Sequence, residues 1–85
     1  MQRNHRKAYT ALKKLGVPVF TNDDHEAMGI FGISAEESNS SEWVNYFNSP
    51  KDWVFGVHPD VDRILFDHEL FAEWQNPGFL NVYNA

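Results

Sequence analysis

The sequence predicts an α+β domain in which a small antiparallel sheet with a C-terminal hairpin packs against two to three helices. Two observations favour this fold class: helical spacing of apolar residues early in the chain, and two β-prone runs separated by turn residues at its end. An aromatic content of 15% supplies bulky residues from which a core can be built. Because 85 residues suffice for only one core, we expect residues 1–85 to form a single compact domain.

The first predicted element is an amphipathic helix over residues 4–15. Its apolar residues, among them Ala8, Leu12 and Leu15, recur at helical spacing, while basic and polar residues cover most of the remaining circumference. Gly16 follows as a natural C-terminal cap, because glycine adopts the left-handed conformation that ends many helices.

Two short strands are predicted next. Residues 17–20 are apolar, and Pro18 favours an edge or strand-start position because proline cannot donate a ladder hydrogen bond. Residues 21–26 are predicted to form a polar turn. Residues 28–33 are β-prone, and their two glycines indicate a bulge or the close approach of another backbone.

Two further helices are predicted in the middle of the chain. One starts near Ser41 and ends before Pro50, with the apolar residues of 43–47 on one face. The other starts at Pro59, which suits a first helical position, with His58 as an N-cap or loop contact. The inner face of this helix is expected to contain Val61, Ile64, Leu65 and His68.

A hairpin is predicted at the C-terminal end. Residues 71–74 and 79–83 are β-prone, and residues 75–78 (Gln-Asn-Pro-Gly) are typical of a turn. We expect the helix of residues 4–15 and the helix around Trp43 to cover the sheet. The predicted core consists of Leu12, Leu15, Phe31, Trp43, Phe47, Ile64, Leu65, Trp74 and Val82.

Charge is distributed very unevenly along the chain. Residues 1–15 contain five cations and no acid, whereas residues 16–85 contain two cations and twelve acids, so the formal charges are +5 and −10. Acids gathered on one face resemble a line of phosphates and attract a cationic partner. The candidate partner-binding residues are Asp23, Asp24, Glu26, Glu36, Glu37, Glu42, Asp60 and Asp62.

The sequence contains no pattern that indicates catalysis. It has no cysteine, its four histidines match no established metal-ligand spacing, and it lacks a nucleophile elbow and a phosphate-binding glycine loop. We therefore expect no enzyme activity, catalytic residue, metal or cofactor. No stretch approaches the length of a membrane span, and we expect a cytoplasmic protein that is a monomer or a homodimer.

Part of the C-terminal half resembles a known group of proteins. Trp53-Val-Phe-Gly-Val-His-Pro-Asp-Val-Asp-Arg-Ile-Leu, followed by Glu73-Trp74-Gln75-Asn76-Pro77-Gly78 and by Val82-Tyr83, resembles small uncharacterised accessory proteins of phages and prophages. This resemblance implies a mobile-element context, and anti-CRISPR and anti-restriction inhibitors, some of which mimic DNA, are the nearest functional analogy. The expected function is therefore that an acidic face of this chain binds and inhibits a basic nucleic-acid-handling protein.

An alternative follows from the order of the predicted elements. Helix, strand, helix, helix, strand, turn and strand is also the order of a winged-helix DNA-binding domain. The basic first helix would then contact phosphates through Arg3, Arg6 and Lys7. The helix that begins at Pro59 opposes this alternative, because its acids would face the phosphates of a duplex.

Overall fold

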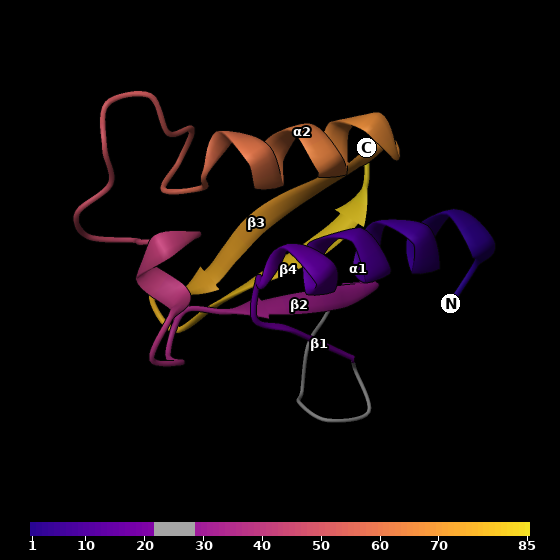
Figure 1. Cartoon of the computed structure of the whole chain (residues 1–85), viewed down its shortest axis with the longest axis horizontal. Coiled ribbons are helices and arrows are strands. Elements are labelled where there is room, and N and C mark those ends of the chain that lie inside the picture. Colours follow the sequence, from indigo (N-terminus) through magenta and orange to yellow (C-terminus); the bar gives the residue numbers. More distant parts are fainter. Residues whose placement is uncertain (22–28) are drawn as a thin grey trace.

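The computed structural model describes residues 1–21 and 29–85 (Figure 1). The described part contains two α-helices, one 3₁₀ turn and a four-stranded antiparallel sheet, which confirms the α+β class. In chain order the elements are α1 (Arg3–Leu15), β1 (Val19–Thr21), β2 (Phe31–Ser34), η1 (Ser40–Glu42), α2 (Pro59–Asp67), β3 (Leu70–Asn76) and β4 (Phe79–Asn84).

The sheet has the strand order β1-β2-β4-β3, so the last strand in the sequence lies inside the sheet. Val82 of β4 is opposite Phe31 of β2 on one side and Ala72 of β3 on the other. The pairing of β3 with β4 confirms the predicted C-terminal hairpin, with strands somewhat longer than expected. A register shift between Trp74 and Asn76 marks the end of the regular ladder.

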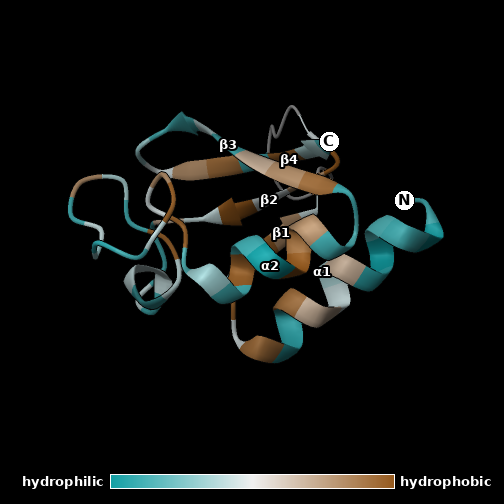
Figure 2. Cartoon of the chain, turned by 90° about the horizontal axis from the view of Figure 1, so that it is seen from above, coloured by the Kyte–Doolittle hydropathy of each residue, from teal (hydrophilic) through white to brown (hydrophobic). Residues whose placement is uncertain are grey.

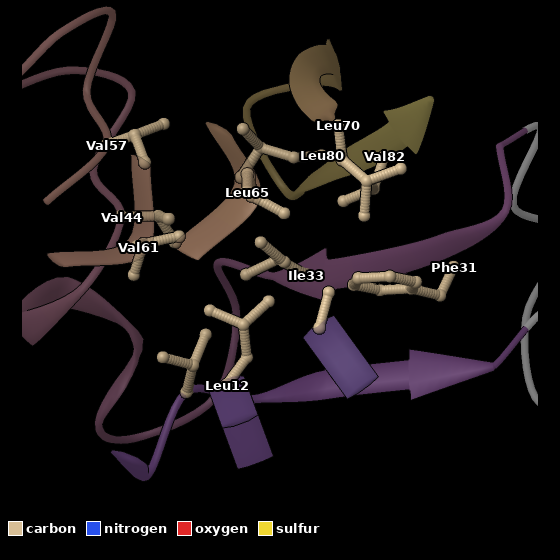
Figure 3. Packing of buried hydrophobic residues seen from close by; sticks show 12 residues of the cluster. Leu12, Phe31, Ile33, Val44, Val57, Val61, Leu65, Leu70, Leu80 and Val82 are labelled. Atoms are coloured by element: carbon tan, nitrogen blue, oxygen red, sulfur yellow. The ribbon is translucent and has the colours of Figure 1, made fainter. Parts of the chain in front are cut away.

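Both α-helices lie on the same face of the sheet, as Figure 2 shows. Between the layers, apolar side chains from α1, α2, β2, β3 and β4 point toward one another (Figure 3). Leu12 of α1, Ile33 of β2 and Leu80 of β4 are 0% exposed, and Leu65 of α2 is 1% exposed. Burying one such side chain stabilises a fold by about 1.5–3 kcal/mol, so this interface is the principal source of stability.

The first helix forms nearly as predicted. It begins at Arg3 and ends at Leu15, and Gly16 caps it with a φ of 102°. The N–H of Gly16 donates to the carbonyl of Lys13 (3.1 Å), and the N–H of Val17 donates to the carbonyl of Leu12 (3.0 Å). Only glycine adopts this backbone conformation without strain, which explains why the helix ends at this position.

The first two strands pair with each other and are shifted along the sequence from their predicted ranges. β1 starts at Val19, directly after Pro18, and occupies one edge of the sheet, as expected from the missing proline N–H. β2 starts at Phe31, and Gly29 lies against the backbone of Val82, which is the predicted close approach. The predicted turn of residues 21–26 lies outside the described residues except for Thr21, which belongs to β1.

The prediction of a helix around Trp43 is wrong. Only the 3₁₀ turn η1 forms there, and α2 takes the expected place of this helix on the sheet. The side-chain oxygen of Asn45 accepts hydrogen bonds from the N–H groups of Phe47 (3.1 Å) and Asn48 (3.0 Å). This turn competes with helical hydrogen bonding, and Val44 instead forms an antiparallel bridge with Val57.

Two members of the predicted core lie at the surface instead. Phe47 is 80% exposed because it follows the Asn45 turn, and Leu15 is 38% exposed at the last position of α1. Leu12, Phe31, Leu65 and Val82 are buried as predicted. The remaining members, Trp43, Ile64 and Trp74, are partly buried against the core.

Candidate functional site

Several of the predicted partner-binding acids lie on three segments that meet at one end of the molecule. Glu36 and Glu37 follow β2, Glu42 is the last residue of η1, and Asp60 and Asp62 lie in the first turn of α2. In Figure 1 these segments lie at the end of the sheet opposite to both chain termini. We call Glu36, Glu37, Glu42, Asp60 and Asp62 the acidic end.

Hydrogen bonds hold these three segments together. The N–H of Glu37 donates to the Oγ of Ser40 (3.0 Å), and the hydroxyl of Ser40 donates to the carbonyl of Ser34 (2.8 Å). The N–H of His58 donates to the carbonyl of Trp43 (2.8 Å), which joins η1 to the start of α2. Ser40 is 1% exposed, so the two bonds of its hydroxyl are partly shielded from water. The acids of this end therefore belong to segments that hydrogen bonds join.

The start of α2 combines a helix cap with two acids. The Nδ1 of His58 accepts a hydrogen bond from the N–H of Asp60 (2.9 Å), as expected for an N-cap. Asp60 also accepts a bond from Arg63 (3.1 Å), but the Arg63 side chain is 69% exposed, so this ion pair contributes little to stability. Asp60 and Asp62 both stabilise the helix through its positive N-terminal end.

The other acids of this end are free of ion pairs in the described part of the chain. Glu36, Glu37, Glu42 and Asp62 are exposed, and the ion pairs among described residues involve only Asp60. Their charges are consequently open to an external cation. The predicted acids Asp23, Asp24 and Glu26 lie outside the described residues.

A second surface, which was not predicted from the sequence, runs along β3. Two hollows are lined by apolar residues of β3 and of the loop before α2, together with two acids. Their principal lining residues are Val54, Phe55, Phe71, Ala72, Trp74 and the acids Asp62 and Glu73. Asp62 belongs to both surfaces, so the hollows begin where the acidic end stops.

A tight turn forms one wall of these hollows. Residues 54–57 close on themselves, because Val57 donates to the carbonyl of Val54 (3.0 Å). The two central residues, Phe55 (φ 51°) and Gly56 (φ 77°), both have left-handed backbones, and the Phe55 side chain is 87% exposed. Left-handed φ is rare for a bulky residue, and Gly56 was the one sequence signal for this turn.

The first helix presents a separate, cationic surface. Its outer side is lined by Arg3, Arg6, Lys7, Thr10, Ala11 and Lys14. The helix pair that a winged-helix domain requires is not formed by the described residues, since the segment around Trp43 is not helical. The described elements therefore lack the second helix of the winged-helix order, and the cations of α1 are exposed.

The described histidines have structural partners. The Nε2 of His5 lies 2.9 Å from the Oδ1 of Asn84, and the Nδ1 of His68 lies 2.7 Å from the carbonyl oxygen of Ile64. Across residues 1–21 and 29–85, no three histidine, aspartate or glutamate side chains are grouped closely enough to hold a metal ion.

Comparisons with protein-family models, with curated proteins and with solved structures found no match to this chain. In the described part of the chain, neither helix has the length and apolar character needed to cross a membrane.

Proposed function

We propose that this chain is a non-catalytic binding protein of the inhibitory type, which uses its acidic end to occupy the nucleic-acid site of a basic protein. The observation that carries the proposal is the meeting of β2, η1 and α2 at one end of the molecule. This meeting gathers the exposed carboxylates of Glu36, Glu37, Glu42 and Asp62 on segments joined by hydrogen bonds.

Electrostatics supply the physical reason for this partner class. Carboxylates on segments that hydrogen bonds join present negative charge to a partner as the phosphates of a duplex do. Such a surface accelerates encounter with a cationic protein and repels nucleic acid itself. The resemblance of the C-terminal half to phage accessory proteins supports an inhibitor, with anti-CRISPR and anti-restriction proteins as the functional analogy.

The cationic side of α1 favours a second candidate function, which is direct binding of nucleic-acid phosphates. Arg3, Arg6, Lys7 and Lys14 lie together on the outer side of this helix. Against this candidate, the rest of the chain carries a formal charge of −10 and would be repelled by a long duplex.

The proposed function can be tested with two variants that change net charge equally. Glu36→Lys/Glu37→Lys reverses two charges of the acidic end. Asp67→Lys/Glu69→Lys reverses the charges of the last residue of α2 and of a residue just after it, at the other end of this helix (Figure 1). Each immobilised protein is exposed to a bacterial lysate at low and high salt, and captured proteins are identified by mass spectrometry. A short DNA duplex is then added as a competitor.

The proposal expects basic nucleic-acid-binding proteins to be captured by the wild type and by Asp67→Lys/Glu69→Lys. Capture should be lost with Glu36→Lys/Glu37→Lys, and both high salt and the duplex should release the partner, because they compete for the same cations. Capture that survives reversal of Glu36 and Glu37, or that the duplex does not affect, contradicts the proposal. If the immobilised wild type retains the duplex itself, and Arg3→Glu/Lys7→Glu abolishes this retention, the second candidate function, direct binding of nucleic-acid phosphates, is favoured.

A further inference from the structure

The free edge of β3 carries a second, more specific inference. Within the described residues β3 pairs only with β4, so its other edge has no strand partner. One hollow is lined by four consecutive residues of this strand, from Phe71 to Trp74, together with Phe55. Phe71 and Glu73 are exposed on one face of the strand, whereas Ala72 and Trp74 are partly buried on the other, so a hollow lined by all four residues indicates a position beside the strand edge.

We propose that this edge binds an extended segment of a partner protein as an additional β-strand, and that the segment combines apolar with basic side chains. The inference rests on the proposed function, since it takes the partner to be a basic protein. It adds the place where a segment of the partner docks and the conformation that the segment adopts. The acidic end would attract the partner, and the β3 edge would hold one of its strands.

An extended segment fits this surface better than a helix does. A free strand edge offers unpaired backbone N–H and C=O groups, which pair with another extended backbone, while side-chain hollows beside the edge select alternate residues. The two edges of the sheet differ in this respect. β1 has three residues and follows Pro18, whereas β3 has seven residues and contains Phe71, Ala72 and Trp74.

The acidic residues beside the β3 edge favour a partner segment that carries basic side chains. The acids Asp62 and Glu73 line the hollows, and no lysine or arginine does. A basic residue beside an apolar one would therefore complement this edge. A second copy of the chain would complement it poorly, because antiparallel pairing of two β3 strands would bring Glu73 near the acids of the other copy.

Phe55 is placed to close over a bound strand. Its ring is 87% exposed, and its carbonyl oxygen accepts a hydrogen bond from the Nε1 of Trp74 (2.7 Å). The Tyr46 ring packs edge-to-face with the Trp74 ring, and their centroids lie 5.3 Å apart. Aromatic anchors of this kind supply most of the energy of many interfaces, so Phe55 is the residue whose loss should be most visible.

The test uses a fluorescent peptide of seven alternating lysine and valine residues, matched to the seven residues of β3. Binding is measured by anisotropy and mapped by amide chemical shifts. Two further peptides carry N-methyl groups on alternate backbone amides. One peptide is methylated at the odd positions and the other at the even positions. Only one edge of a strand faces β3, so one methylated peptide should lose binding and the other should keep it.

The protein variants are chosen as matched pairs. Phe55→Asn should weaken peptide binding roughly tenfold, whereas Phe47→Asn, which removes an equally exposed phenylalanine outside the hollows, should not. Glu73→Lys should also weaken binding, and a glutamate–valine peptide should not bind. Shift changes are expected at β3 and Phe55. Three outcomes would overturn the inference. The two methylated peptides could bind equally well, the chemical-shift changes could centre on residues other than β3 and Phe55, or the chain could dimerise through β3.

This test separates the inference from the proposed function. Glu36→Lys/Glu37→Lys should abolish capture of the lysate partner but change the affinity for the short peptide little. If reversal abolishes capture and the peptide fails to bind, the strand site is wrong and the acidic-end function stands. If the peptide binds at β3 and reversal leaves capture unchanged, the strand site stands and the acidic-end function is wrong.

Discussion

The indole N–H of Trp74 donates a 2.7 Å hydrogen bond to the carbonyl oxygen of Phe55, nineteen positions earlier in the chain. This bond fastens the turn of residues 54–57 to the edge strand β3. Phe55 itself has a left-handed backbone, and its ring lies in solvent. An exposed aromatic ring and a disfavoured backbone both oppose stability, and their combination at one residue is typical of functional sites.

Replacement of Phe55 by asparagine should raise the free energy of unfolding. Asparagine tolerates the left-handed region far better than phenylalanine, and relief of this strain contributes about 1 kcal/mol. The measurement is urea unfolding followed by tryptophan fluorescence. Phe47→Asn serves as the control and should be nearly neutral. A clear loss of stability in Phe55→Asn would show that the ring supports the fold and is not held ready for a partner.

Ser40→Ala should destabilise the protein, whereas Ser41→Ala should not. The hydroxyl of Ser40 is buried between the carbonyl of Ser34 and the N–H of Glu37, and its removal leaves both groups unpaired. The expected loss is about 1–3 kcal/mol. Ser41 is its exposed neighbour. Thermal unfolding of the two variants checks the difference, and equal melting temperatures would refute the role given to Ser40.

His58→Ala should shorten or loosen α2, and His58→Asn should preserve it. The Nδ1 of His58 accepts from the N–H of Asp60, and alanine has no acceptor at this position, so a loss of about 1 kcal/mol is expected. Asparagine restores the acceptor but not the ring contacts with Trp43 and Trp53. Hydrogen exchange at the first turn of α2 separates the two effects: protection should fall in His58→Ala and recover in His58→Asn.

Leu65→Ala should cost about 2–5 kcal/mol, because it leaves a cavity in the core between α2 and the sheet. Leu65 is 1% exposed, whereas Phe47, also predicted as core, is 80% exposed. Phe47→Ala should therefore change the free energy of unfolding by less than about 0.5 kcal/mol, as for most surface substitutions. Denaturant titration of the two variants measures the contrast directly. A large loss in Phe47→Ala would contradict its position at the surface.

Elements with strong local signals could be predicted from the sequence. The spacing of apolar residues and Gly16 define α1, Pro59 marks the start of α2, and the Pro77-Gly78 turn marks the hairpin. In each case the signal acts within a few residues, through periodicity, a fixed proline φ or a permitted glycine φ.

The segment from residue 43 to residue 57 could not be predicted in this way. The apolar residues of 43–47 have helical spacing, but the partners of this segment are distant in sequence: Val44 bridges to Val57, and Trp74 holds Phe55. Local periodicity contains no information about such contacts. The candidate site was predictable only in part for the same reason. Its acids can be read from the sequence, whereas the free edge of β3 follows from the order of the strands in the sheet.

The interior position of β4 has a consequence for synthesis of the chain. Because β4 lies between β2 and β3, these strands have no direct ladder to join them until residues 79–84 are in place. On the ribosome, α1, β1 and β2 therefore emerge well before the strand that completes their sheet. Pairing of strands that are distant in sequence costs more loop-closure entropy than pairing within a hairpin, which slows folding. We expect the nascent chain to acquire its fold only after residue 84 leaves the exit tunnel, in a single late step.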